Sequence, residues 1–351
     1  MSKPNSFPVT ALIVTGKGQI EIQKFLLPEP SNDQVVIRVE MCGICTPEQR
    51  VFKGSRATYP YWGGHELAGI VEQAPTNTDL QPGQQVAVGL MLRCGECEAC
   101  RRGLNNHCAY LNQPPADNFP IGPRGFSSHV IVPSYKVFSL PTALPAEKAA
   151  LTEPLACCLH SIQRARVASK DNVVVIGAGT MGLLHTIALT LQGCQVIVAD
   201  NDVEKHSSAF AAGAHRVVTI TELEETNILA EITSGWGPDV FFCTRGGVDA
   251  ITIATNLVGR GGRVVIYQSL RENDELRLRA NLLHYREIEI IGTIAQTTAD
   301  LLQATRILYK HTTLFNSLTV KALPLQQALE AFETAIYGEA NRIMIDFRDL
   351  N

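Results

Sequence analysis

The chain has 351 residues, of which 45% are hydrophobic and 18% charged, with a formal net charge of −4. This length exceeds what one hydrophobic core usually holds, so we expect two domains. No long basic run supports nucleic acid or an anionic membrane as a partner, and no apolar run reaches the roughly 18 residues that span a bilayer. The opening segment, MSKPNSFPVT, lacks the pattern of an export signal, so we expect a soluble cytoplasmic protein.

The predicted elements change character along the chain. The first 150 residues combine short strands, such as 35–40 and 67–72, with turns such as Pro82-Gly83. From about Asp171, apolar runs alternate with helix-like stretches, of which 181–192 is the first. The strands predicted here are 173–176, 196–199, 239–243, 263–267 and 287–291. Because strands that alternate with helices form a doubly wound parallel sheet, we predict an α/β protein in which a nucleotide-binding domain interrupts a β-rich domain.

A glycine-rich turn opens the predicted parallel sheet. Residues 177–182 read GAGTMG, follow an apolar strand, begin a helix and precede a second strand that ends in Asp200. This is the full context of a dinucleotide-binding fingerprint. Gly177 permits the tight turn, Gly179 lets a pyrophosphate approach the backbone, and Gly182 lets helix and strand pack closely. The N-terminus of the helix supplies N–H groups and a positive dipole for the phosphates.

The acidic residue after the second strand indicates which nucleotide binds. Asp200 can accept hydrogen bonds from both ribose hydroxyls of the adenosine and would repel a 2′-phosphate, so the sequence favours NAD over NADP. The alternative is a glycine turn that only joins strand to helix. Further cofactor contacts are expected from Thr180, Met181, Lys205, Cys243 and Thr244.

Four cysteines crowd into one short segment, CGECEACRRGLNNHC. Four thiolates in such a lobe, about residues 93–109, match tetrahedral zinc with every position filled, so we predict a structural zinc site. An iron–sulfur cluster is a poorer match to this spacing, and four unbound thiols are the remaining alternative. His107 lies beside one cysteine and is expected at the surface. The predicted ligands are Cys94, Cys97, Cys100 and Cys108.

Three further segments offer ligands for a second, reacting metal. They contain Cys45, the pair His65-Glu66, and Glu153. Each alone is unremarkable, because a single histidine is usually packed or exposed, and Glu153 before a proline can simply cap a helix. The prediction depends on their joint appearance.

With these motifs, the sequence resembles the zinc-containing medium-chain dehydrogenases, in particular their polyol (sorbitol-like) and threonine dehydrogenase branches. The resemblance covers nearly the whole chain. It implies a GroES-like catalytic domain, residues 1–154 and 296–351, around a Rossmann domain, residues 155–295. It also implies two zinc ions per chain and a homodimer or homotetramer. The matching motifs are Gly64-His65-Glu66, the cysteine lobe, Glu153-Pro154-Leu155, GAGTMG, Gly261-Gly262-Arg263 and Ile291-Gly292.

The resemblance also implies roles for the ligands of the second metal. Cys45 matches the family's first zinc ligand, His65 the second, and Glu66 the adjacent glutamate that can bind or leave the metal. Glu153 takes the position that Glu, Asp or Cys holds elsewhere in the family. Zinc with an open position acidifies an alcohol hydroxyl, and the nicotinamide accepts the hydride. We therefore expect an NAD-linked enzyme that oxidises a secondary alcohol to a ketone.

The segment after Cys45 departs from the family pattern. Pro47 stands where the family carries a relay hydroxyl and can hold no proton, while Thr46 is one position off. Glu48 replaces an aspartate and can still accept a hydrogen bond from the zinc-bound histidine. Arg50 replaces a common histidine and is either a solvated side chain or a contact to an anionic group of cofactor or substrate. We therefore expect the alcohol proton to leave through zinc-bound water and Glu66 or Glu153.

The substrate is the least determined part of the prediction. Side chains that contact it are expected in residues 59–62, 117–126 and 294–298, although the aromatic residues there can equally pack the core. A polyol, a sugar derivative or an amino alcohol follows from the resemblance alone. Two alternatives stay open: a member that binds NAD and zinc without turnover, and a zinc-free type of reductase that acts on activated double bonds.

Overall fold

The computed structural model describes residues 6–56, 58–90, 94–110, 117–141, 144–338 and 340–350. The chain divides into two compact units. The first comprises Met1–Glu153, Thr297–Thr312 and Thr319–Asn351, and the second comprises Pro154–Gln296 and Thr313–Leu318. Residues 313–318, which the sequence assigned to the catalytic domain, thus belong to the second unit, and Phe315 within them is fully buried.

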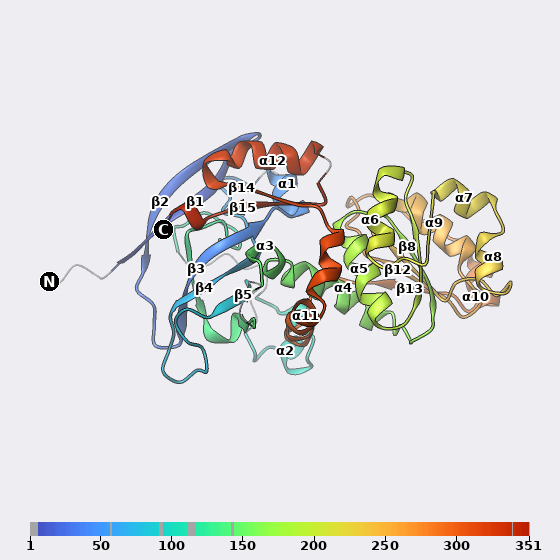
Figure 1. Ribbon diagram of the computed structural model, residues 1–351, viewed down its shortest axis with the longest axis horizontal. Helices are drawn as coiled ribbons and strands as arrows, with labels where there is room; N and C mark the ends of the chain where they lie inside the picture. The colour runs from blue at the N-terminus through green and yellow to red at the C-terminus, as the bar shows by residue number, and fades with distance from the viewer. Residues whose placement is uncertain are drawn as a thin grey trace. The chain divides into compact units, whose positions relative to one another are not determined.

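The first unit is built on one mixed sheet and a separate hairpin (Figure 1). The sheet has the strand order β14-β15-β3-β4-β5-β7, with β6 also paired to β3, and the hairpin joins β1 to β2. Every pairing is antiparallel except β14 with β15. The strands are β1 (Ser6–Gly16), β2 (Gln19–Pro28), β3 (Gln34–Gly43), β4 (Glu66–Gln73), β5 (Gln85–Gly89), β6 (His129–Pro133), β7 (Val137–Ser139), β14 (Val320–Pro324) and β15 (Arg342–Asp346).

Short helices cover this sheet and connect its strands. The helices are α1 (Thr46–Phe52), α2 (Glu98–Arg101), α3 (Ala146–Ala149), α11 (Thr298–Lys310) and α12 (Ala328–Tyr337). Helix α12 packs against β14 and β15 (Figure 1), and its Phe332 meets Phe52 of α1 and Phe126 in the core. Burial of such aromatic rings is a main source of stability in a core of this kind.

The second unit is a parallel sheet flanked by helices (Figure 1). Its strand order is β10-β9-β8-β11-β12-β13, and every pairing is parallel. The strands are β8 (Asn172–Ile176), β9 (Gln195–Ala199), β10 (Arg216–Val218), β11 (Val240–Cys243), β12 (Arg263–Ile266) and β13 (Glu289–Gly292). The helices are α4 (Thr152–Arg164), α5 (Thr180–Leu191), α6 (His206–Ala211), α7 (Ile220–Glu225), α8 (Ile228–Ile232), α9 (Gly247–Leu257) and α10 (Ala280–Arg286).

The strand order of this sheet reverses beside β8, which is where doubly wound sheets bind nucleotides. Strand β8 carries the continuous apolar run VVVI, and all four side chains are fully buried because helices cover both faces. The predicted α/β fold class, a GroES-like domain with a Rossmann-type sheet, is confirmed. The predicted strands and the first helix agree with the observed bounds to within two residues at most ends.

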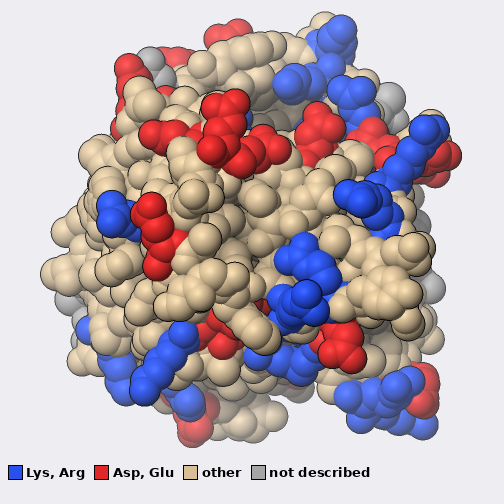
Figure 2. All heavy atoms as spheres, turned by 90° about the vertical axis from the view of Figure 1, so that its right-hand side faces the viewer, with Lys and Arg blue, Asp and Glu red and all other residues tan. Residues whose placement is uncertain are grey.

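The molecular surface carries charges of both signs. On the face shown in Figure 2, acidic and basic side chains are interspersed over the described residues. Within the described part of the chain, no helix combines the length and the apolar character that a membrane span requires.

Candidate functional site

Side chains from three distant segments of the first unit meet in one cluster. Cys45 precedes helix α1, Glu48 lies in the first turn of that helix, and His65 immediately precedes strand β4. Their ligand atoms all lie within 4.8 Å of one another. A second group with the same spacing joins His65 to Glu66 and Glu153, so the two groups share the imidazole.

Two glycines make room for this cluster. A side chain at Gly43 would collide with the Glu66 carboxylate, because the two residues are register partners on β3 and β4. Gly64 has a φ of +90°, and a Cβ there would collide with the backbone nitrogen of Phe126. The GGHELAG segment therefore needs its second glycine so that His65 can face the cluster.

Glu48 holds the ring of His65. Its Oε1 lies 2.9 Å from His65 Nδ1 and accepts a second hydrogen bond from the Gly64 N–H at 3.0 Å. Burial raises the pKa of the Glu48 carboxyl, but His65 and the Gly64 N–H hold it below its ordinary value of 4.5 overall. An ionised Glu48 can only accept, so Nδ1 of His65 carries the proton and Nε2 is left to bind a metal.

Arg342 anchors the neighbouring carboxylate, a contact that sequence analysis missed. Its Nη2 lies 3.0 Å from Oε1 of Glu66, and its Nη1 donates to the carbonyl oxygen of Ile44 at 3.2 Å. Both Arg342 and Glu66 are buried. The only available signal was an arginine directly before the three apolar residues of strand β15, and its partner lies more than 270 residues away in the sequence.

The cluster has the charge and donor types that suit a divalent cation. Three carboxylates, Glu48, Glu66 and Glu153, are buried here, and Oε2 of Glu66 has no hydrogen-bond partner among the described residues. Burial, together with the Glu66 carboxylate, raises the pKa of the Cys45 thiol to about 11. A bound cation would offset this excess of acceptors and favour the thiolate. Sulfur, imidazole nitrogen and carboxylate oxygen are the ligands that zinc takes in proteins.

The second cluster is the four-cysteine lobe. Cys94, Cys97, Cys100 and Cys108 place their sulfur atoms within 4.8 Å of one another. Two of the sulfur pairs are separated by 4.0 Å, close to the roughly 3.8 Å edge of a zinc–sulfur tetrahedron with 2.3 Å bonds. The Cys97 N–H donates to the sulfur of Cys94 at 3.1 Å, which stabilises a thiolate. All cysteines of the chain are free thiols, so no disulfide competes with this arrangement.

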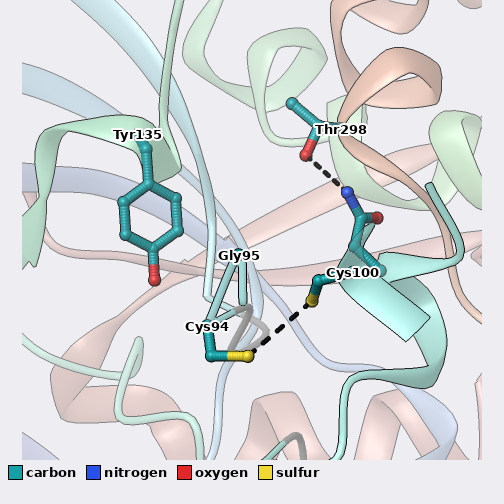
Figure 3. Close-up of a pocket in the computed structure, with 6 residues that line it drawn as sticks. Cys94, Gly95, Cys100, Tyr135 and Thr298 are labelled. Atoms are coloured by element: carbon teal, nitrogen blue, oxygen red, sulfur yellow. Dashed lines mark hydrogen bonds between the residues drawn. The ribbon is translucent and has the colours of Figure 1, made fainter. Parts of the chain in front are cut away.

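A cavity of about 200 Å³ opens beside the lobe (Figure 3). Its lining includes Cys94 and Cys100 on one side and Tyr135 on another. Asn105 of the lobe donates a hydrogen bond of 3.1 Å to the hydroxyl of Thr298, which begins helix α11. The lobe is thus attached to a helix that lies far away in the sequence. Residue 93, the first of the predicted lobe, lies outside the described residues.

The glycine turn of the second unit has the shape that a pyrophosphate requires. Gly177 has a φ of +108°, and a Cβ at Gly182 would collide with the carbonyl oxygen of Gly177. A Cβ at Gly179 would meet no protein atom within 4 Å, so open space lies in front of the turn. Asp200, directly after β9, accepts a hydrogen bond of 2.7 Å from the Ala178 N–H. The turn therefore fits a dinucleotide phosphate.

The remaining predicted cofactor residues take different positions. Thr180 and Met181 begin helix α5, and Thr244 lies beside Gly177, where its hydroxyl donates to the Ile176 carbonyl at 2.8 Å. Cys243 is 0% exposed and lies in the core, and its predicted contact with the cofactor stays a prediction.

Two basic residues, Lys205 and Arg50, were also predicted to contact the cofactor. Lys205 forms a 2.7 Å ion pair with Asp202. Arg50 lies on helix α1 of the first unit, in the same element as Glu48. A contact between Arg50 and an anionic group stays a prediction.

The aromatic residues expected near the substrate pack largely into the core. Trp62 is buried and stacks on Phe25, and Phe119 meets the same ring edge-on. Tyr59 donates its hydroxyl to the Val51 carbonyl at 2.7 Å. Tyr61 is buried in the same core, and its burial, together with the Glu48 carboxylate, raises the pKa of its phenol.

Comparisons with known proteins agree with this geometry. Residues 31–142 match the alcohol dehydrogenase GroES-like domain, and residues 180–318 match the zinc-binding dehydrogenase domain. The chain is 30% identical to D-arabitol-phosphate dehydrogenase from Enterococcus avium, over 94% of this chain and 95% of that protein. It is 29% identical to sorbitol dehydrogenase from Bacillus subtilis, over 80% and 81% of the two chains.

A solved structure extends the likeness to three dimensions. A zinc-binding dehydrogenase from Sinorhizobium meliloti 1021, bound to NADP, superposes with a TM-score of 0.83 at 25% identity, over 97% of this chain and 99% of that one. The fold, the clustered ligands and these relatives lead to one conclusion: the chain belongs to the zinc-binding alcohol dehydrogenases of the medium-chain superfamily and is an oxidoreductase.

Proposed function

We propose that this enzyme transfers hydride between a secondary hydroxyl of a polyol, or of a polyol phosphate, and NAD. The observation that carries the proposal is the pair of ligand groups that share His65, one with Cys45 and Glu48 and one with Glu66 and Glu153, in a chain related to arabitol-phosphate and sorbitol dehydrogenases. The polyol class follows from those relatives. A sugar derivative and an amino alcohol remain the other substrates to test.

The first unit supplies the ligands for the reacting metal. Cys45 and His65 would hold zinc together with Glu66 or Glu153, and zinc, when bound, would acidify the substrate hydroxyl. Glu48 fixes the ring of His65 through the 2.9 Å hydrogen bond to Nδ1. Arg342 holds the Glu66 carboxylate near the backbone of Ile44, so an ion pair restrains Glu66.

The proton of the hydroxyl needs an acceptor other than the usual relay. Pro47 lies at the start of helix α1 and has no group that carries a proton. We infer that a carboxylate oxygen of Glu153 receives it, because Glu153 lies within 4.8 Å of the ligand atoms of His65 and Glu66. Glu153→Ala should lower turnover and change its pH profile, and an unchanged profile would reject this role.

The second unit would bind NAD through the turn at residues 177–182. The positive φ of Gly177, the open space at Gly179 and the acidic Asp200 support this assignment. A structural zinc in the four-cysteine lobe would make two zinc ions per chain. The free cysteines fit a reducing compartment such as the cytoplasm. A homodimer or homotetramer is proposed from the resemblance and is tested by light scattering.

The test is a substrate panel read by NADH absorbance. Sorbitol, D-arabitol phosphate, galactitol phosphate, a sugar acid and threonine would each be incubated with the purified enzyme and NAD. We expect turnover with at least one polyol or its phosphate and loss of turnover after removal of zinc, with recovery on its return. Metal-loaded protein that binds NAD but oxidises none of the panel would favour the member without turnover. Full activity without metal would contradict the proposal.

A further inference from the structure

An arginine pairs with the acidic residue that is expected to select the cofactor. Nη1 of Arg245 lies 3.3 and 3.4 Å from the two carboxylate oxygens of Asp200. Asp200 directly follows β9, and Arg245 lies two residues beyond the end of β11. Strands β9 and β11 flank β8 in the sheet. The two side chains therefore reach toward each other across the carboxyl end of β8, where the glycine turn begins.

The stem of Arg245 is packed on the glycine turn. A Cβ at Gly177 would lie 2.7 Å from Cγ and 3.0 Å from Cδ of Arg245. The aliphatic part of the arginine thus occupies the space that the missing side chain of Gly177 leaves. Gly177 consequently has a second role here beyond its backbone conformation.

Both carboxylate oxygens of Asp200 accept backbone hydrogen bonds, whereas the guanidinium of Arg245 keeps free donors. Oδ2 of Asp200 accepts the Ala178 N–H at 2.7 Å and Oδ1 accepts the Asp202 N–H at 3.0 Å. The Asp200 side chain is 3% exposed, while that of Arg245 is 55% exposed. In the described part of the chain, only Nη1 of this guanidinium forms hydrogen bonds. Nε and Nη2 therefore remain available to an anionic ligand.

An unpaired carboxylate at this position repels an adenosine 2′-phosphate, and an arginine nearby accommodates it. The present chain holds both groups in contact. The positive charge offsets the repulsion by Asp200, and the planar donors of a guanidinium suit phosphate oxygens. A related zinc-binding dehydrogenase from Sinorhizobium meliloti 1021 is bound to NADP.

We propose that Arg245 is a specificity-determining residue that lets the enzyme accept NADP alongside NAD. The inference rests on the proposed function in one respect, namely that the second unit binds a nicotinamide dinucleotide. Lys205 is the weaker candidate for the same task, because its ammonium is engaged by Asp202 at 2.7 Å.

The test measures dissociation constants of NAD and NADP by isothermal titration calorimetry, without substrate. Arg245→Ala should raise the dissociation constant of NADP about tenfold or more, as the loss of a charge-assisted phosphate contact predicts. The constant for NAD should change less than about threefold. Arg245→Lys should retain most of the NADP affinity, because the charge stays.

Arg166→Ala is the matched control. Arg166 also pairs with an acid in the second unit, but its partner Glu289 begins the edge strand β13, whereas Asp200 and Arg245 follow strands that flank the central β8. This variant should bind both dinucleotides as the unchanged enzyme does. If Arg245→Ala weakens the binding of NAD and NADP equally, or leaves the dissociation constant of NADP unchanged, the role of Arg245 is overturned, while the proposed function still stands. An unchanged enzyme that binds neither dinucleotide would overturn the proposed function as well.

Discussion

The two metal-ligand clusters of the first unit differ in how the chain assembles them. The four-cysteine lobe takes all its ligands from residues 94–108, whereas the cluster around His65 joins ligands from residues 45 to 153. The lobe offers four identical thiols, most of them partly exposed. The other cluster offers a thiol, an imidazole and buried carboxylates.

The comparison indicates how one unit can use one ligand cluster for stability and another for the reaction. Four thiolates fill a tetrahedral zinc site and leave no position for a substrate. Mixed ligands held by neighbours such as Glu48 and Arg342 leave the coordination open to change. The lobe needs only local turns and the contact to Thr298, whereas the mixed cluster needs the pairing of β3 with β4 and of β15 with β3.

The largest expected effect comes from Cys45→Ser. Loss of one ligand should empty the mixed cluster and lower kcat/KM about 1,000-fold, since Lewis-acid stabilisation is worth several kcal/mol. Metal analysis should find one zinc per chain in place of two, because the lobe is untouched. Cys157→Ser is the control, since this cysteine belongs to neither cluster. Unchanged zinc content and turnover in Cys45→Ser would remove the distinction between the clusters.

Cys97→Ser tests the other half of the comparison. Loss of the zinc proposed for the lobe should lower the unfolding midpoint by roughly 6–12 °C, which corresponds to about 3 kcal/mol of metal-linked stability. Turnover per folded molecule at low temperature should stay within about twofold, because the open coordination position is elsewhere. Differential scanning calorimetry and initial rates measure the two quantities. A large loss of turnover without destabilisation would assign the lobe to the reaction itself.

Glu48→Ala probes the support of His65. The histidine would lose the carboxylate partner of Nδ1, and the zinc affinity expected of the mixed cluster should fall about 10–100-fold. The zinc affinity of Glu48→Gln should fall between those of Glu48→Ala and the unchanged enzyme, since the amide oxygen of glutamine can still accept a hydrogen bond. Competition with a chromophoric chelator measures both constants. Equal affinity in all three proteins would show that Glu48 does not orient the ring.

The smallest effect is expected from Arg342→Lys. The positive charge is retained, but a single ammonium cannot easily donate hydrogen bonds to both the Glu66 carboxylate and the Ile44 carbonyl. The zinc dissociation constant of the mixed cluster should change about threefold to fivefold, close to 1 kcal/mol. Arg348→Lys is the matched control, because its pair with Asp346 is more exposed. An effect no larger than the control's would mean that Arg342 does not restrain Glu66.

Local patterns in the sequence were sufficient to predict much of this architecture. The apolar run of β8, the GAGTMG turn and the closely spaced cysteines each encode their structure within a few residues, because backbone preference and side-chain spacing act over that range. The same reasoning could nominate Cys45, His65 and Glu153 only through a resemblance, since nothing local to each residue relates it to the others.

Tertiary structure alone decided which side chains meet. Arg342 reaches Glu66 because β15 pairs with β3, and Arg245 reaches Asp200 because the sheet order places β8 between their strands. The burial of Cys243 likewise follows from helix packing on β11. Such contacts depend on the register and order of strands far apart in the chain, which hydrophobic patterning by itself does not specify.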